Sequence, residues 1–137
     1  MSSLEVKDLH VTINGSHILQ GVNFSVPENK VTALLGRNGV GKSTTLKAIL
    51  GLNAGTGSIK FSGTEIIDLP THKIVQMGLG YVPEDREIFA SLTVKENLAL
   101  AERDANPNYD LVYSIFPELL TRTSQRADRA CRSADRQ

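Results

Sequence analysis

Cysteine is almost absent from this chain, and so is any imbalance of charge. One cysteine in 137 residues excludes an internal disulfide framework and fits a reducing, cytosolic setting. The 15 basic and 15 acidic side chains cancel, which gives no electrostatic reason to expect a nucleic-acid partner. No apolar run approaches the roughly 20 residues that span a bilayer, and the N-terminus lacks a secretory signal pattern. We therefore expect a soluble protein with no direct membrane insertion, which reaches a membrane only through a partner.

Hydrophobic residues make up 40% of the chain, enough for one modest globular domain with a core. Residues 4–11 and 18–26 are predicted to be half-buried strands, with a hairpin-type turn at Asn14-Gly15 between them. A shorter strand is predicted at 59–61. These segments indicate an antiparallel layer in the N-terminal half.

Two other apolar runs have a different profile. Residues 31–35 and 80–82 are short, apolar and bounded by glycine or proline, which is typical of strands buried on both faces of a sheet. Two helices are predicted between these runs. One begins at Lys42 and stops at Gly51, and a short one is expected to be capped by Thr71.

The C-terminal half is predicted to be helical. Thr93 is followed three residues later by Glu96, a capping-box pattern that predicts a helix over 93–102. Apolar residues at helical spacing predict another helix over 109–120.

The segment after the 31–35 run reads GRNGVGKST and fits the P-loop pattern G-x-x-x-x-G-K-[ST]. Glycines at 36, 39 and 41 can adopt positive φ and bring the backbone close to a ligand. A concave row of N–H groups then binds phosphate oxygens at the start of a helix. The predicted cofactor-binding residues of this loop are Gly36, Asn38, Gly39, Gly41, Lys42, Ser43 and Thr44.

Three of these residues have specific roles in the predicted site. Lys42 would reach the β- and γ-phosphates of ATP, and the Ser43 hydroxyl would ligate Mg²⁺. Thr44 is placed to donate toward the α-phosphate. The alternative is a glycine-rich turn that happens to contain a lysine. The position of the motif between a buried-type strand and a helix favours the P-loop.

The P-loop is shared by small-molecule kinases, GTPases, helicases and transport ATPases, so it does not fix the function. More specific are three segments: LEVKDLHV, GSHILQGVNFSVPENKVTALLGRNGVGKSTTLKAILGL and above all GLGYVPEDREIFASLTVKENL. On these segments, residues 4–126 resemble the N-terminal half of an ATP-binding-cassette (ABC) ATPase, and most of all the ATP-binding subunit of branched-chain amino acid importers.

This resemblance implies an α/β fold: a P-loop NTPase core of mixed sheet, an N-terminal antiparallel β layer and the start of a helical subdomain. It implies ATP and Mg²⁺ as ligands. It also implies a second ATPase subunit and transmembrane permease subunits as partners, with the chain held at the cytoplasmic face of the membrane through the permease. Residues 1–126 are then a partial nucleotide-binding domain.

Two positions depart from the usual pattern of the family. Ile13 occupies the place where an aromatic side chain usually stacks on adenine, and we expect it to cover the base by apolar contact instead. Glu84 stands where many cassette ATPases have glutamine, in the loop that senses Mg²⁺ and the attacking water. The branched-chain importers often have glutamate there, so Glu84 is predicted as a catalytic and metal-contacting residue. An exposed acid in a turn is the structural alternative.

Later motifs of the family are missing from the sequence. There is no LSGGQ-type signature, no apolar strand ending in Asp-Glu and no switch histidine after Phe89. We therefore expect a truncated N-terminal half with negligible hydrolysis of its own. A non-hydrolysing ATP-binding fragment, or a different P-loop enzyme such as a small-molecule kinase, are the alternatives.

The tail 127–137 is atypically polar, and residues 121–137 contain no Val, Ile, Leu, Met or aromatic residue. The last eight residues, ACRSADRQ, can be encoded by GCC TGT CGG TCG GCG GAC AGG CAR. Read two nucleotides later, those codons give Leu-Ser-Val-Gly-Gly-Gln, close to the missing signature. We therefore interpret the tail as a frameshifted reading of a longer gene, which sequencing of that gene tests.

Overall fold

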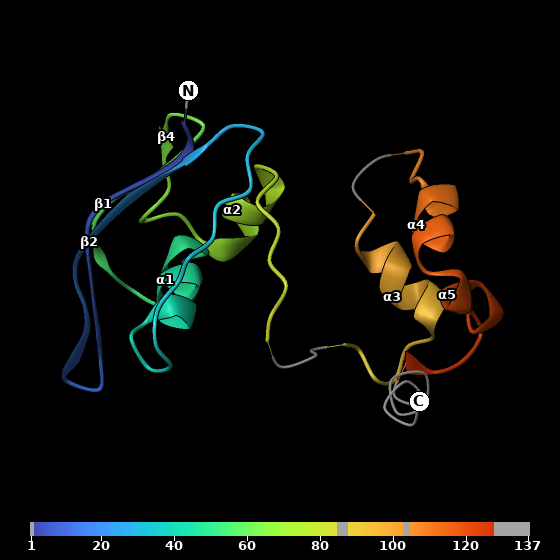
Figure 1. The fold of residues 1–137 in the computed structure, drawn as a ribbon. Helices are drawn as coiled ribbons and strands as arrows, with labels where there is room; N and C mark the ends of the chain where they lie inside the picture. Colours follow the sequence, from blue (N-terminus) through green and yellow to red (C-terminus); the bar gives the residue numbers. More distant parts are fainter. Residues whose placement is uncertain (1, 85–87, 103–104, 128–137) are drawn as a thin grey trace. The chain divides into compact units, whose positions relative to one another are not determined.

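The structure is a computed structural model that describes residues 2–84, 88–102 and 105–127. It divides into two compact units, Met1–Tyr81 and Val82–Gln137, each of which is described by itself. Figure 1 shows strands and helices in the first unit and a cluster of helices in the second. The predicted polar tail lies outside the described residues, apart from its first residue, Ala127.

The first unit is built on a four-stranded antiparallel sheet with the strand order β2-β1-β3-β4. The long pair is β1 (Ser2–Ile13) with β2 (Ser16–Pro27), and the shorter strands are β3 (Thr56–Phe61) and β4 (Thr64–Glu65). The central strand β1 pairs on both of its edges. The antiparallel layer expected from the sequence is therefore present.

Two tight turns fix the hairpins of this sheet. Asn14 (φ 50°) and Gly15 (φ 80°) join β1 to β2, and Ser62 (φ 48°) and Gly63 (φ 81°) join β3 to β4. Positive φ at both central residues is the geometry of a type I′ turn, whose twist matches that of the flanking strands. The predicted hairpin at Asn14-Gly15 is confirmed.

Helix α1 (Lys42–Ile49) packs against one face of the sheet, as Figure 1 shows. Its C-cap is Leu50, and Gly51 follows with φ 69°, a left-handed conformation that ends a helix at little cost for glycine. The predicted start and stop of this helix are both confirmed. The core of the unit joins the strands to the two helices and consists of Val6, Leu9, Val11, Leu19, Ala48, Ile49, Leu50, Ile59, Ile66 and Ile74.

Helix α2 (Thr71–Gln76) is the short helix predicted in this region, but its predicted cap is wrong. Pro70 is the N-cap, and no side chain caps the helix. A capping side chain belongs to the residue just before the helix and accepts from the N–H groups of the first turn. Thr71 is already the first helical residue, so it is not at that position.

The two strands predicted to be buried on both faces are not strands in the structure. Residues 31–35 and 80–82 have no regular secondary structure, and Val31 and Val82 are 101% and 91% exposed. A strand buried on both faces needs neighbouring strands at its edges and a layer over each face. None of the described segments pairs with either run. Of the two runs, only Tyr81 packs against the core, and it is half-buried.

The second unit contains α3 (Val94–Leu100), α4 (Tyr109–Ile115) and α5 (Pro117–Thr121). The predicted capping box is confirmed: the Thr93 hydroxyl accepts from the backbone N–H of Glu96 (3.2 Å), and the Thr93 N–H donates to the Glu96 carboxylate (2.7 Å). These two bonds satisfy backbone groups that a helix start otherwise leaves unpaired.

The single helix predicted over 109–120 is wrong, because the helix breaks at Phe116 (φ −126°, ψ 71°). Pro117 causes the break. A proline disfavours helical φ and ψ in the residue before it, and it has no N–H to continue the hydrogen-bond ladder. Proline is well tolerated at the first position of a helix, where it starts α5.

The last described residues return to the start of α3. Backbone N–H groups of Val94 and Lys95 donate to the carbonyls of Gln125 (2.9 Å) and Thr123 (3.0 Å), and Ala127 N–H donates to Leu92 (2.9 Å). Val94 and Ala127 are both buried. The polar segment up to Ala127 is therefore an integrated part of this unit.

Candidate nucleotide-binding site

The N-terminal end of α1 has neither a capping side chain nor an acidic residue beside it. Its N-cap is Gly41 (φ 99°, ψ 13°), no side chain caps it, and its first turn contains no acidic residue. The first N–H groups of a helix have no acceptor within the helix, and the helix dipole makes this end positive. Uncapped N–H groups without a nearby carboxylate suit an anion such as phosphate.

Lys42 lies over the loop that precedes this helix. Its ammonium donates to the carbonyl oxygens of Gly36 (2.7 Å) and Arg37 (2.8 Å). An ammonium group has three donors, so these two bonds leave one for a ligand. The loop is further closed by a bond from the Val40 N–H to the Arg37 carbonyl (3.3 Å). The lysine is therefore held in the loop while keeping a donor for a phosphate oxygen.

The three loop glycines are required for different reasons. Gly39 (φ 84°) and Gly41 (φ 99°) have the positive φ expected from the sequence. The same expectation for Gly36 is wrong, because its φ is not in that region. At Gly36 the constraint is space, since a Cβ there would lie 2.7 Å from Cγ2 of Val40.

Thr45 anchors the loop to the helix, a role that the sequence analysis missed. Its N–H (2.8 Å) and its hydroxyl (2.9 Å) both donate to the carbonyl of Gly41, and the side chain is only 3% exposed. The sequence contains the pattern that indicates this role, because a threonine in a helix commonly donates to the carbonyl four residues earlier.

The remaining predicted residues of the P-loop lie on the same stretch of chain. Asn38 and Ser43 are exposed, and Thr44 is half-buried at the first turn of α1. Within the described part of the chain, no cluster of three or more His, Cys, Asp and Glu side chains could hold a metal. Mg²⁺ commonly takes one or two protein ligands together with phosphate oxygens and water, so the Ser43 hydroxyl fits its requirements.

Ile13, the predicted adenine contact, lies in the same unit as the loop. It is the last residue of β1 and is 37% exposed. Val11, two residues earlier on the same face, pairs with Leu19, and Leu19 packs against Gly41. Ile13 therefore lies about 7 Å further along β1 than Val11.

Glu84 is exposed in a turn of the second unit. Its predicted catalytic and metal-contacting roles remain predictions. The neighbouring residues 85–87 of the family-like segment lie outside the described residues.

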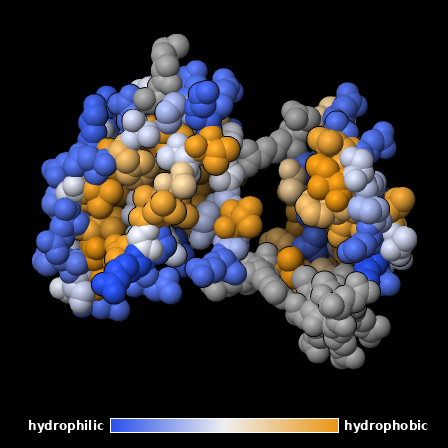
Figure 2. Space-filling view, in the orientation of Figure 1, coloured by the Kyte–Doolittle hydropathy of each residue, from blue (hydrophilic) through white to orange (hydrophobic). Residues whose placement is uncertain are grey.

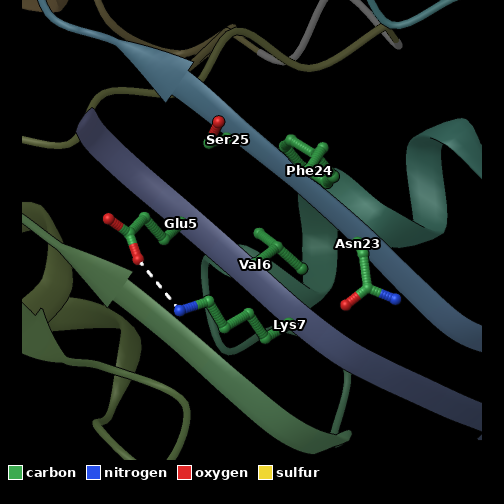
Figure 3. Close-up of a pocket in the computed structure, with 6 residues that line it drawn as sticks. All are labelled: Glu5, Val6, Lys7, Asn23, Phe24 and Ser25. Atoms are coloured by element: carbon green, nitrogen blue, oxygen red, sulfur yellow. Dashed lines mark ion pairs between the residues drawn. The ribbon is translucent and has the colours of Figure 1, made fainter. Parts of the chain in front are cut away.

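A pocket of about 420 Å³ lies over β1 and β2, and its lining contains no P-loop residue. Figure 3 shows the six lining residues, which are Glu5, Val6, Lys7, Asn23, Phe24 and Ser25. The Glu5 carboxylate and the Lys7 ammonium form an exposed ion pair at 3.4 Å. Exposed ion pairs of this kind contribute little stability. We interpret this pocket as part of the solvated surface of the sheet.

Comparisons with known proteins agree with the geometry of the loop. The family model described as ABC transporter matches residues 19–136. A probable branched-chain amino acid transport ATP-binding protein, LivF, of Archaeoglobus fulgidus is 39% identical over 109 residues, which are 75% of this chain and 46% of that protein. A lipopolysaccharide export system ATP-binding protein, LptB, of Haemophilus influenzae is 38% identical over 99 residues, 72% of this chain and 41% of that protein.

A solved structure described as the ATP-binding subunit of an ABC transporter has the same fold. It superimposes with a TM-score of 0.72 at 33% identity, over 90% of this chain and 53% of that chain. The α/β P-loop fold with its antiparallel layer and helical subdomain is thus confirmed. This chain spans about half the length of the relatives it matches. It belongs to the ABC transporter family and carries part of the ATP-binding domain of such a transporter.

Proposed function

We propose that this chain binds Mg-ATP through residues 36–44 and serves as the ATP-binding part of an importer for branched-chain amino acids. The observation that supports binding most directly is the uncapped start of α1 beside Lys42, whose ammonium keeps one donor after bonding Gly36 and Arg37. The positive end of the helix and this ammonium both favour an anion such as phosphate.

Each ligand group has a proposed partner in the chain. Lys42 contacts the β- and γ-phosphates, Ser43 ligates Mg²⁺, and Thr44 donates toward the α-phosphate. Asn38 and the loop glycines supply backbone N–H groups, and Ile13 covers the adenine by apolar contact. Glu84 is the proposed sensor of Mg²⁺ and of the attacking water.

Branched-chain amino acids are proposed as the cargo because the segment GLGYVPEDREIFASLTVKENL resembles that subfamily. The relative from Archaeoglobus fulgidus carries this function in its name. The relative from Haemophilus influenzae is named for lipopolysaccharide export at nearly the same identity, so overall identity alone does not select the cargo.

The proposed partners are transmembrane permease subunits and a second ATPase subunit. Among the residues that the structure describes, no helix is long and apolar enough to cross a bilayer. We place the chain at the cytoplasmic face of the membrane through the permease. Sedimentation with membranes only when permease subunits are co-produced tests this placement.

Hydrolysis by this chain alone is proposed to be negligible. The sequence contains no LSGGQ-type signature and no apolar strand ending in Asp-Glu after Phe89. Without these groups, nothing supplies the general base for water or the acid that helps hold Mg²⁺.

The decisive experiment is binding of a fluorescent ATP analogue with Mg²⁺ to the purified chain, compared with two lysine variants. Lys42→Ala should weaken binding by roughly 1.5–3 kcal/mol, because it removes a charge-assisted phosphate contact. Lys47→Ala is the matched control, since Lys47 is an exposed lysine in the last turn of the same helix. Equal affinity of both variants, or no saturable binding by the folded chain, would overturn the proposal.

A further inference from the structure

The chain contains two Asn-Gly pairs, and one of them lies in the predicted phosphate loop. These pairs are Asn14-Gly15 and Asn38-Gly39. Asparagine is chemically labile, and a glycine after it increases this lability because no Cβ hinders attack by the glycine nitrogen on the side-chain amide. Each pair is therefore a candidate for deamidation, and the fold decides how readily each one reacts.

The two groups that would react at Asn38-Gly39 have no partners in the loop. In the described part of the chain, neither the Asn38 side-chain amide nor the Gly39 N–H takes part in a hydrogen bond. A Cβ on Gly39 would meet nothing within 4 Å, so the space around the nitrogen is open. Both residues are exposed at the surface of the first unit, where Figure 2 shows hydrophilic side chains beside apolar ones. Water and base can therefore reach the pair.

The backbone around this pair is held by one long hydrogen bond. Asn38 and Gly39 are the central residues of a turn that the Val40 N–H closes by donating to the Arg37 carbonyl at 3.3 Å. This distance is longer than is usual for a strong N–H···O bond. Attack on the side chain requires rotation of Asn38 about its Cα–C bond, and a turn closed by one weak bond resists that rotation little.

Asn14-Gly15 has the same sequence but a firmer setting. The pair forms the tight turn between β1 and β2, and the residues on either side of it, Ile13 and Ser16, are partners in the sheet. The same rotation at Asn14 would disturb the turn that fixes the register of this hairpin. We therefore expect Asn38 to react faster than Asn14 in the folded chain.

We infer that Asn38-Gly39 is a deamidation site through which the phosphate loop loses affinity for nucleotide. The Gly39 nitrogen gives its proton to base and attacks Cγ of Asn38. A bond from this nitrogen to Cγ forms, the bond from Cγ to the amide nitrogen breaks, and the amide nitrogen takes a proton and leaves as ammonia. Water then opens the cyclic imide at one of its two carbonyl carbons, which leaves aspartate or isoaspartate. The net reaction consumes water and releases ammonia, and it needs no oxidant or reductant.

Both products oppose phosphate binding, and this consequence rests on the proposed function of the loop. Each product carries a carboxylate in place of a neutral amide, close in sequence to a helix whose first turn contains no acidic residue. A carboxylate in the loop repels phosphate and competes with it for the positive end of the helix. Phosphate bound to the Gly39 N–H would also occupy the attacking nitrogen. The empty loop is therefore the form that deamidates.

Peptide mapping by mass spectrometry tests the site without nucleotide. The full chain is kept at mildly alkaline pH, where the glycine nitrogen loses its proton more readily, and samples are taken over time. Trypsin cleaves after Lys30 and Arg37, so the two Asn-Gly pairs are measured in separate peptides. We expect the Asn38 peptide to convert several times faster than the Asn14 peptide, as a mixture of aspartate and isoaspartate. In urea the two should convert at similar rates, because glycine follows both asparagines. An Asn38 peptide that stays intact in the folded chain, or that converts no faster than the Asn14 peptide, would overturn the inference.

Three variants connect the reaction to nucleotide affinity. Asn38→Gln keeps an amide, but its longer side chain closes the ring slowly, so its peptide should stay intact. Asn38→Asp reproduces the charge of the products and should weaken binding of the fluorescent ATP analogue about tenfold. Asn14→Asp makes the same charge change in the hairpin turn and should leave the affinity unchanged.

The analogue with Mg²⁺ should also slow conversion at Asn38 and not at Asn14. Equal affinity of Asn38→Asp and the unchanged chain would overturn the loss of affinity. Deamidation is measured by mass in the absence of nucleotide, so it does not depend on ATP binding. An unchanged chain that deamidates at Asn38 but never binds the analogue would refute the proposed function and confirm the modification site.

Discussion

Gly41 faces the side chain of Leu19 so closely that a Cβ on Gly41 would lie 2.6 Å from Cδ2 of that leucine. Leu19 is buried in the sheet, and Gly41 is the N-cap of α1. The contact therefore joins the last residue of the phosphate loop to the core of the unit, and it sets how near the helix start can approach β2.

Gly41→Ala should lower the free energy of unfolding by about 2–5 kcal/mol. Alanine at φ 99° is strained, which costs about 1–2 kcal/mol, and its methyl group overpacks against Leu19, which costs a further 1–3 kcal/mol. Urea unfolding followed by circular dichroism measures the change.

Gly39→Ala is the matched control for that substitution. Gly39 also has positive φ (84°), but a Cβ there meets nothing within 4 Å. It should cost only the backbone strain, about 1–2 kcal/mol. Equal destabilisation by the two variants would show that the Leu19 side chain moves away from the added methyl group without a loss of stability.

Thr93→Ala should cost about 1 kcal/mol of α3 stability, because it removes the hydroxyl that accepts from the Glu96 N–H. The same substitution also removes the bond from that hydroxyl to the Glu96 carboxylate (2.8 Å). Hydrogen exchange of the α3 amides measures the effect locally. Thr93→Ser keeps both bonds, so its α3 amides should exchange nearly as slowly as those of the unchanged chain. Faster exchange in the serine variant would mean that packing of the threonine methyl group, and not the cap, stabilises α3.

Features set by neighbouring residues could be predicted from the sequence. Asn14 and Gly15 adopt the turn conformation that joins β1 to β2, and Gly51 ends α1. Thr93 and Glu96 form a capping box with each other. Each depends on backbone conformation within a few residues. The break at Pro117 is also local, and giving more weight to the proline than to the apolar spacing around it would have found it.

Features that depend on contacts with residues far away in the sequence could not be predicted in the same way. The apolar pattern of 31–35 reports a need for burial but not whether partners are present. For the candidate site, the motif predicts which residues of the loop before α1 bind the nucleotide, and that assignment stays a prediction. The bonds from Lys42 to two carbonyls, and the anchoring of Gly41 by Thr45, depend on the folded path of the loop.

Pro117→Ala should join α4 and α5 into one helix over 109–121. The substitution restores an N–H at residue 117 and removes the restriction on Phe116, so the residue can adopt helical φ and ψ. The Cα chemical shift of Phe116 should move to a helical value. Pro107→Ala lies outside the helices and should leave that shift unchanged. An unchanged Phe116 shift in Pro117→Ala would mean that tertiary packing imposes the break.

The carboxylate of Glu65 accepts from the Ser58 hydroxyl and from the Ile59 N–H, each at 2.6 Å. Burial is the largest single influence and raises the pKa of Glu65. The hydrogen bonds from Ser58, Ile59 and Ile67, together with the charge of Lys60, outweigh it, and the net result is a lowered pKa.

A lowered pKa in the folded state means that the ionised group stabilises the fold above the pKa of the unfolded chain, about 4.3 to 4.5. This stabilisation should be lost as the pH falls from there through the folded pKa. Ser58→Ala removes one donor, so it should raise the pKa of Glu65, as followed by the side-chain carboxyl carbon in an NMR titration. In Glu65→Gln the loss of stability as the pH falls below the pKa of the unfolded chain should be smaller than in the unchanged chain. An identical pH dependence of the two proteins would mean that this carboxylate is bonded equally well in the unfolded chain.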